Sequence, residues 1–135
     1  FKTAFMSHLA SVYHKLGWAM QLHYGCKRDN NTDMFNKLGP DTGYDTINNY
    51  APSAEMADFL DSLNREGNLP KTIIYSLNPA DNAAIVTTMN CFQGDGIRGK
   101  MQHGSAWWFN DHKPGMIEQM TSLASLGLLG NFIGI

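Results

Sequence analysis

The sequence has few of the residues that define several large classes of protein. It contains two cysteines in 135 residues, Cys26 and Cys91, which lie far apart and form no CxxC motif. We therefore expect no disulfide framework and predict a cytoplasmic protein. Charged residues make up only 16% of the chain, with a net charge of −2 and mixed signs. This balance argues against a nucleic-acid partner and against a polybasic membrane patch.

Long hydrophobic stretches are also missing. The longest uncharged run, residues 119–135, includes three glycines and several polar side chains, which makes it too short and too polar for a membrane span. The start of the chain has no signal-peptide pattern. The chain opens at Phe1 and closes within a strand-like run. We interpret it as a single domain over residues 1–135 that is part of a longer protein, with a trimmed small protein as the alternative.

What the sequence does contain is a repeated unit of an apolar strand followed by an amphipathic helix. Strands are predicted at residues 18–23, 72–77 and 100–108, with a fourth starting at 131–135, and helices at 3–16, 53–67, 79–91 and 114–126. Strands that alternate with helices predict an α/β fold with parallel pairing. Since a closed (β/α)8 barrel needs about 250 residues, the predicted architecture is a partial TIM barrel with open sheet edges.

The helical periodicity also predicts core residues, caps and one long connection. The expected inward residues are Phe5, Leu9, Val12, Tyr13, Leu16, Met56, Phe59, Leu60, Leu63, Ile85, Val86, Met89, Met116, Met120 and Leu123. Ser53 and Asn78 are predicted helix N-caps. Residues 24–52 show no periodicity, and connections of this length usually form functional loops or lids.

Ligands of parallel α/β proteins bind at the carboxyl ends of the strands, where this sequence has His23, Asn78, Trp107 and Trp108. His23 could bind a metal, act as an acid or base, or hydrogen-bond a substrate, or it could be a structural histidine. Asn78 is explained by helix capping alone. The two tryptophans cannot face the same side of one strand, so one could pack in the core while the other lines the mouth of a pocket, with core packing as the alternative for either one.

Arg28 follows the first predicted strand. Its guanidinium suits a carboxylate or phosphate, with a loop salt bridge to Asp29, Asp33 or Asp41 as the alternative. The run at 94–99 fits GxGxxG, but a helix precedes it and a strand follows, so we predict a flexible turn and no nucleotide site. The histidines fit neither HxH nor HxxxH, and zinc held wholly within this segment is not expected.

Several blocks in combination resemble bacterial uronate (glucuronate) isomerase of the amidohydrolase superfamily. The similar blocks are QLHYG at 21–25 with Arg28, NNT at 30–32, MF at 34–35, LGPDTGYD at 38–45, KTIIYSLNP at 71–79 with DN at 81–82, GSAWWFND at 104–111, and GLLGNFIG at 127–134. Together they extend over nearly the whole chain.

This resemblance implies strands five to eight of a (β/α)8 barrel. The implied activity interconverts D-glucuronate with D-fructuronate and D-galacturonate with D-tagaturonate, by proton transfer between C1 and C2. His23 would be the catalytic fifth-strand histidine near one divalent metal such as zinc, with the remaining ligands outside this chain. Arg28, Trp107, Trp108 and Asn78 would contact the uronate.

The resemblance also implies a homo-oligomeric parent with no nucleic-acid or membrane partner. The family's HxH pair and eighth-strand aspartate fall outside the segment, and Cys26, Lys27 and Asp33 depart from the family pattern. We therefore predict that the isolated 135 residues are inactive. Two alternatives remain: a small α/β module that binds carboxylates or sugar acids without catalysis, and a structural fragment that self-associates through its open edges.

Overall fold

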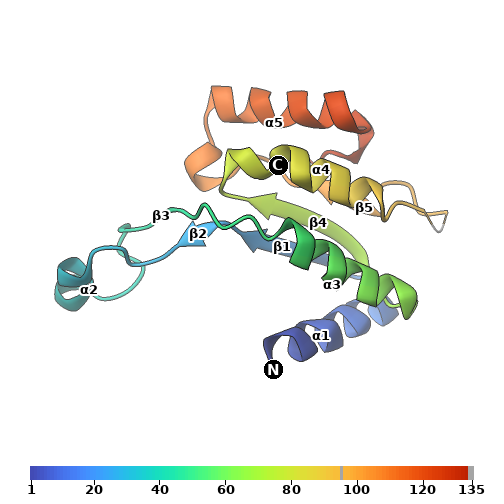
Figure 1. The fold of residues 1–135 in the computed structure, drawn as a ribbon, viewed down its shortest axis with the longest axis horizontal. Helices are drawn as coiled ribbons and strands as arrows, with labels where there is room; N and C mark the ends of the chain where they lie inside the picture. Colours follow the sequence, from blue (N-terminus) through green and yellow to red (C-terminus); the bar gives the residue numbers. More distant parts are fainter. Residues whose placement is uncertain (95, 134–135) are drawn as a thin grey trace.

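A computed structural model describes residues 1–94 and 96–133 of the chain (Figure 1). Helices and strands alternate through most of it, in the order α1 (Lys2–Leu16), β1 (Ala19–Tyr24), α3 (Ser53–Arg65), β4 (Lys71–Ser76), α4 (Asn82–Asn90), β5 (Met101–His103) and α5 (Lys113–Leu126). The segment between β1 and α3 contains three further elements, β2 (Cys26–Lys27), α2 (Thr32–Leu38) and β3 (Thr46–Ile47). Short 3₁₀ turns follow as η1 (Pro79–Asp81), η2 (Trp108–Asn110) and η3 (Leu129–Asn131).

The main sheet is parallel and has the order β1-β4-β5. Ala19 pairs with Lys71 at the start of β1 and β4, and Thr72 pairs with Met101 where β5 begins. On the far side of β5, His103 forms an isolated parallel bridge with Phe132. The predicted α/β class with parallel pairing is therefore confirmed. Of the predicted fourth strand, Asn131 ends a 3₁₀ turn and Phe132 forms this bridge, and residues 134–135 lie outside the described part.

All the long helices pack on one face of this sheet. Along that face, Met20 of β1, Ile74 of β4 and Met101 of β5 contribute to a single hydrophobic core. The helices complete the core with Ala10, Leu60, Leu63, Ile85, Val86, Met89 and Leu123. Neighbouring helices contact one another in the order α1, α3, α4, α5. Because successive strand residues point to opposite faces, His23 and its neighbours of the same parity lie on the face without these helices.

Two predicted strands differ from the structure. β1 lies at the edge of the sheet and is largely open to solvent, with Met20 as its one fully buried residue and Trp18 before it 58% exposed. The strand predicted at 18–23 is present, shifted by one residue to 19–24, and only one of its faces is covered. The strand predicted over 100–108 ends at His103. A 3₁₀ turn holds Trp108, whose φ of 51° is incompatible with a strand.

The buried face of α5 was predicted correctly at Leu123 and incorrectly at two methionines. Met116 and Met120 are exposed, and the buried residues are Gly115, Gln119 and Leu123. This face is selected by a polar contact, because Gln119 Nε2 donates a hydrogen bond of 2.6 Å to the carbonyl oxygen of Gly104. A hydrophobicity pattern cannot register such a contact.

Smaller differences concern helix ends and the first helix. Ser53 is the first residue of α3 and its side chain makes no capping bond, because Pro52 occupies the cap position. On α1 the predicted apolar face is only partly covered, with Phe5 and Leu16 exposed and Ala10 fully buried. The turn predicted at 94–99 does lie between α4 and β5 and no helix follows it, although residue 95 is outside the described part.

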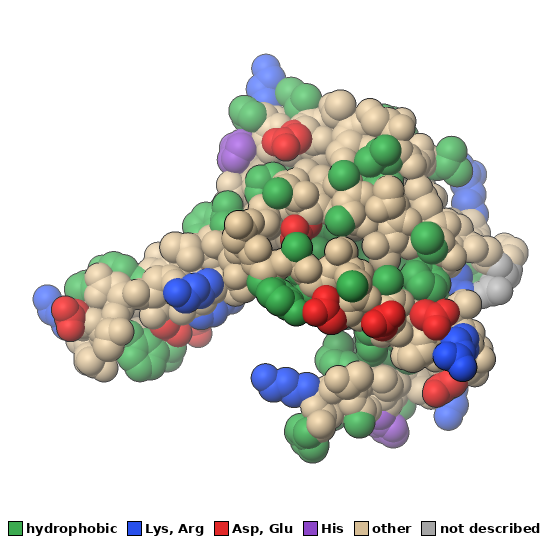
Figure 2. All heavy atoms as spheres, viewed as in Figure 1, with side chains coloured by type: hydrophobic (Ala, Val, Ile, Leu, Met, Phe, Trp, Pro, Cys, Tyr) green, Lys and Arg blue, Asp and Glu red, His purple; other side chains and the backbone are tan. Residues whose placement is uncertain are grey.

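The segment predicted as a long loop forms an arm that projects from the body of the molecule (Figures 1 and 2). Strands β2 and β3 pair antiparallel at its base, with Cys26 opposite Ile47, and α2 lies at its tip. Asn31 caps α2 by accepting a hydrogen bond from the Met34 amide. The arm thus has its own hydrogen-bonded structure, although its sequence shows little periodicity. Within the described residues, no helix is both long and apolar enough to cross a membrane.

Candidate functional site

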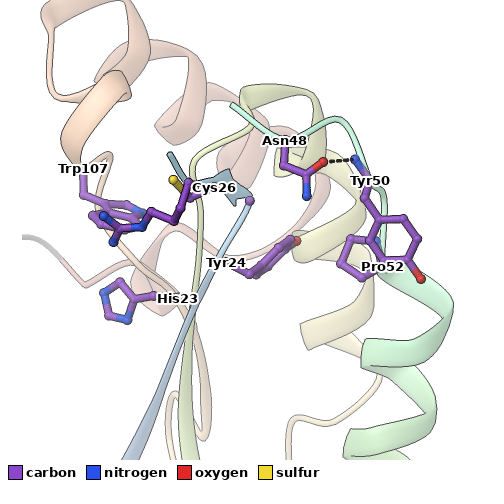
Figure 3. Close-up of a pocket in the computed structure, with 9 residues that line it drawn as sticks. His23, Tyr24, Cys26, Asn48, Tyr50, Pro52 and Trp107 are labelled. Atoms are coloured by element: carbon purple, nitrogen blue, oxygen red, sulfur yellow. Dashed lines mark hydrogen bonds between the residues drawn. The ribbon is translucent and has the colours of Figure 1, made fainter. Parts of the chain in front are cut away.

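A cavity of about 480 Å³ opens at the carboxyl end of β1, where the arm leaves the sheet (Figure 3). Its lining residues come from the end of β1, the base of the arm and the loop before η2: His23, Tyr24, Gly25, Cys26, Arg28, Asn48, Tyr50, Pro52 and Trp107. His23 and Tyr24 project to opposite sides of the strand end, with His23 on the side of Trp107. Three predicted site residues, His23, Arg28 and Trp107, therefore line one cavity.

The imidazole of His23 is held between two aromatic rings. It stacks on Tyr75 with a centroid distance of 4.1 Å and an angle of 9°, and it meets Trp107 edge to face at 4.9 Å. These neighbours remove water from the imidazole and lower its pKa, an effect that a backbone hydrogen bond at Gln21 partly offsets. The neutral form of His23 is therefore favoured, and in that form one ring nitrogen has a free lone pair.

The aromatic contact extends from Trp107 to the arm. Trp107 and Trp108 have a centroid distance of 5.7 Å, and the Cζ atom of Arg28 lies 4.8 Å from the centroid of Trp108. Trp108 lies outside the lining of the first cavity but lines a second one of about 330 Å³, which it shares with Trp107. The expectation that one tryptophan packs in the core and the other lines the pocket mouth assumed that both lie on a strand. In the structure Trp107 lines both cavities, Trp108 lines the second, and the two rings contact each other.

Arg28 forms two ion pairs, both through Nη1. Its distances are 3.1 Å to Asp41 and 3.2 Å to Asp45. The Asp45 side chain is only 3% exposed and also accepts a hydrogen bond from the Asp29 amide, whereas the Asp41 side chain is 79% exposed. Of the predicted salt-bridge partners, Asp41 is found, and Asp45 takes the place of the others. Asp45 therefore anchors the base of the arm, and Asp41 is a loosely held partner.

A buried polar network lies below the cavity. Ser76 donates a hydrogen bond of 2.7 Å to the carboxylate of Asp81, and both residues are buried. Burial raises the pKa of the nearby Tyr24 phenol, and the Asp81 carboxylate raises it further. Gly25 passes so close to Ser76 that an added Cβ would lie 2.8 Å from Oγ, and its φ is +89°. The network and the glycine together fix the turn that leads from β1 to Arg28.

Asn78 lies apart from the cavity lining. Its Oδ1 accepts a hydrogen bond from the Ala80 amide at 3.1 Å, which caps η1, and its Nδ2 lies 3.4 Å from Asn49 Oδ1. The predicted capping role is thus confirmed. Its predicted contact with substrate stays a prediction. In this structure the side chain contacts the Ala80 amide and the side chain of Asn49.

Sequence reasoning missed Tyr75, Asn48 and Tyr50. Tyr75 occupies the position of β4 directly beside His23, so the register of two parallel strands would have identified it. Asn48 and Tyr50 reach the cavity because β3 returns the arm to the sheet, and the Asn48 amide donates to the Gly25 carbonyl at 2.8 Å. No local sequence pattern predicts that β3 brings the chain back to the sheet.

The side chains present do not amount to a metal centre. Within residues 1–94 and 96–133, no three His, Cys, Asp or Glu side chains lie close enough together to hold an ion. His23 could supply one ligand through its neutral imidazole. A divalent metal in the parent enzyme stays a prediction, and no chemical step is assigned to a metal.

A parallel sheet with helices on one face and a polar and aromatic cavity at a strand end defines an α/β protein with a strand-end ligand site. Residues 1–135 match the family model described as glucuronate isomerase. The chain belongs to this family.

Relatives support the same assignment. The chain is 64% identical to the uronate isomerase of Lachnoclostridium phytofermentans and 63% identical to that of Lachnospira eligens, in each case over the whole of this chain and 29% of the relative. A crystal structure of uronate isomerase from Thermotoga maritima superposes with a TM-score of 0.82 at 32% identity, over 97% of this chain and 27% of that one. The chain thus spans about 29% of the length of its curated relatives.

Proposed function

We propose that this chain supplies part of the substrate site of an aldose–ketose isomerase that acts on hexuronates, within a (β/α)8 barrel completed by further chain. The proposed reactions interconvert D-glucuronate with D-fructuronate and D-galacturonate with D-tagaturonate. The single observation that carries the proposal is the grouping of His23, Trp107 and Arg28 around one strand-end cavity, in a chain of the glucuronate isomerase family.

Arg28 is proposed to bind the carboxylate of the uronate. Both of its ion pairs use Nη1, which leaves Nη2 and Nε to form the two-pronged contact that carboxylates favour. Asp41 is exposed enough to leave when a ligand arrives, while buried Asp45 keeps the guanidinium in place. The uronate carboxylate would thus replace Asp41 and preserve the charge balance around Arg28.

Trp107 and His23 are proposed to contact the sugar. The indole offers an apolar surface for the C–H groups of the ring or open chain, and the neutral imidazole can accept a hydrogen bond or a proton. In the isomerisation, the proton that leaves C2 of the aldose is returned to C1, while a proton moves from O2 to O1 through an enediol. Since the lining of this cavity includes no carboxylate, we propose that the second acid–base group is supplied by the further chain that completes the barrel.

Calorimetric titration of the purified chain tests the carboxylate contact. We expect D-galacturonate and D-glucuronate to bind and D-galactose to bind at least tenfold more weakly. Arg28→Gln should abolish uronate binding, and Asp41→Asn should strengthen it several-fold. Arg65→Gln removes a comparable charge from the surface pair with Asp61 on α3 and is the matched control. Binding that survives in Arg28→Gln would contradict the assignment.

Turnover and selectivity address the other parts of the proposal. The isolated 135 residues should show no isomerisation of either uronate, and measurable turnover would contradict the need for further chain. The alternative is a small α/β module that binds carboxylates or sugar acids without catalysis, and the two ion pairs that hold Arg28 within this chain support it. A general carboxylate module would bind lactate as tightly as galacturonate, whereas a sugar-acid site would prefer galacturonate.

A further inference from the structure

Tyr75 stands out among the residues near the cavity because it touches His23 without belonging to the cavity lining. The two residues are register partners on neighbouring parallel strands, so their side chains leave the same face of the sheet. Their rings stack at 4.1 Å with an angle of only 9°. One full face of the imidazole is therefore covered by the phenol ring.

Tyr75 is itself fixed by its surroundings. Its hydroxyl group donates a hydrogen bond of 3.1 Å to Oε1 of Gln21, and only 3% of the residue is exposed. On the side of β5, Gly104, the residue that follows this strand, provides the space for the ring. A Cβ added at Gly104 would overlap Cδ1 of the Tyr75 ring, so only glycine fits at this position.

Trp107 completes the arrangement from another direction. Its indole meets the imidazole at 89° with 4.9 Å between the ring centroids, so Trp107 restricts rotation of the His23 ring towards its side. The lone pair and the N–H group of an imidazole lie in the plane of the ring. Fixing that plane therefore fixes the directions in which His23 can accept or donate.

We propose that Tyr75 is a positioning residue that sets the plane of the His23 imidazole, with Gln21 and Gly104 holding Tyr75 in place. The inference rests on the proposed function for its chemical purpose, since an oriented nitrogen serves proton transfer or ligation. It implies that a ring at position 75 is required, and that the hydroxyl group contributes by anchoring this ring.

Proton NMR of the purified chain tests the proposal without any ligand. The Hδ2 and Hε1 signals of His23 should lie upfield of those of exposed His8, because protons above an aromatic ring are shielded, and they should show cross-relaxation to the Tyr75 ring. Tyr75→Leu should remove the upfield displacement. Tyr75→Phe keeps the ring and should restore most of it. Tyr13→Leu, which removes the partner of the distant Trp18, should leave the His23 signals unchanged.

Gln21→Ala provides a second test if Tyr75→Leu does not fold, because Gln21 is exposed. It should reduce the upfield displacement of the His23 signals by releasing the Tyr75 hydroxyl group. Unshielded His23 signals in the wild-type chain, or signals that are unaffected in both Tyr75→Leu and Gln21→Ala, would overturn the proposal. The uronate titration is independent: shielded His23 signals together with uronate binding that survives in Arg28→Gln would contradict the proposed function and leave the positioning role intact.

Discussion

The guanidinium of Arg28 lies over the indole of Trp108, with 4.8 Å between Cζ and the ring centroid. Such contacts contribute about 0.5–1 kcal/mol at exposed sites. Trp108 reaches this position with a φ of 51°, a conformation that costs a non-glycine residue about 1–3 kcal/mol. The contact joins the arm to the loop after β5, and so it connects two parts of the site that no strand pairing brings together.

The base of the arm should depend on Asp45 far more than on Asp41. Asp45→Ala leaves the Asp29 amide and Arg28 without a buried partner, and we expect a loss of about 1–3 kcal/mol in local stability. Asp41→Ala removes an exposed pair and should cost about 1 kcal/mol or less. Limited proteolysis within residues 29–45 measures the difference. Equal cleavage rates in the two variants would contradict the anchoring role of Asp45.

Gly104→Ala should destabilise the chain by about 1–3 kcal/mol, the usual cost of overpacking, because the new Cβ would overlap the ring of Tyr75. Gly130→Ala is the control, since the nearest atom to its added Cβ is 3.8 Å away. Urea unfolding followed by circular dichroism gives both values. A Gly104→Ala variant as stable as Gly130→Ala would mean that the Tyr75 ring can move aside.

Removing the cap at Asn78 should cost about 1 kcal/mol. Asn78→Ala loses the hydrogen bond from the Ala80 amide, whereas Asn78→Asp keeps an acceptor in the same place. The urea midpoint should therefore fall in the first variant and be largely retained in the second. If Asn78→Asp were as unstable as Asn78→Ala, the amide contact with Asn49 would be the more important one.

His103 should make the chain less stable in mild acid. The residue is fully buried, and burial lowers the pKa of its imidazole from 6.5 to about 4. Between these values the unfolded chain binds a proton that the folded chain does not, so stability is full above pH 6.5 and falls as the pH drops towards 4. The loss should reach about 3 kcal/mol.

Urea unfolding at pH 7 and pH 4.5 measures this dependence, with His103→Gln as the comparison. Glutamine keeps a polar group opposite Gln119 but does not titrate. We expect the variant to lose much less stability between the two pH values than the wild-type chain. The same loss in both proteins would assign the acid sensitivity to other groups.

The features that were predicted correctly depend on local sequence patterns or on the geometry of parallel strands. Local patterns identified β4 and the four longer helices, since apolar periodicity and terminal glycines act over one or two turns, but they missed α2 in the arm. The strand-end rule also placed His23 and Trp107 in one region, because parallel strands end at the same edge of a sheet. The sequence resemblance agrees with the family match over residues 1–135.

Other features depended on partners distant in the sequence. Gln119 replaced Met116 and Met120 on the buried face of α5 because the carbonyl oxygen of Gly104 requires a donor. The predicted strand over 100–108 ended early as the chain turned at Gly104 beside Tyr75. Periodicity reports only how often apolar residues recur, and it cannot say which polar group will need a hydrogen bond.

The sequence by itself determined the alternation of helices and strands and the chemical types at the strand ends, because both follow from near neighbours and from the geometry of parallel pairing. The tertiary structure alone decided that the His23 imidazole lies on Tyr75 and that Asp45 holds Arg28. Those contacts depend on strand register and on the return of the arm through β3, which are fixed only when the whole core packs.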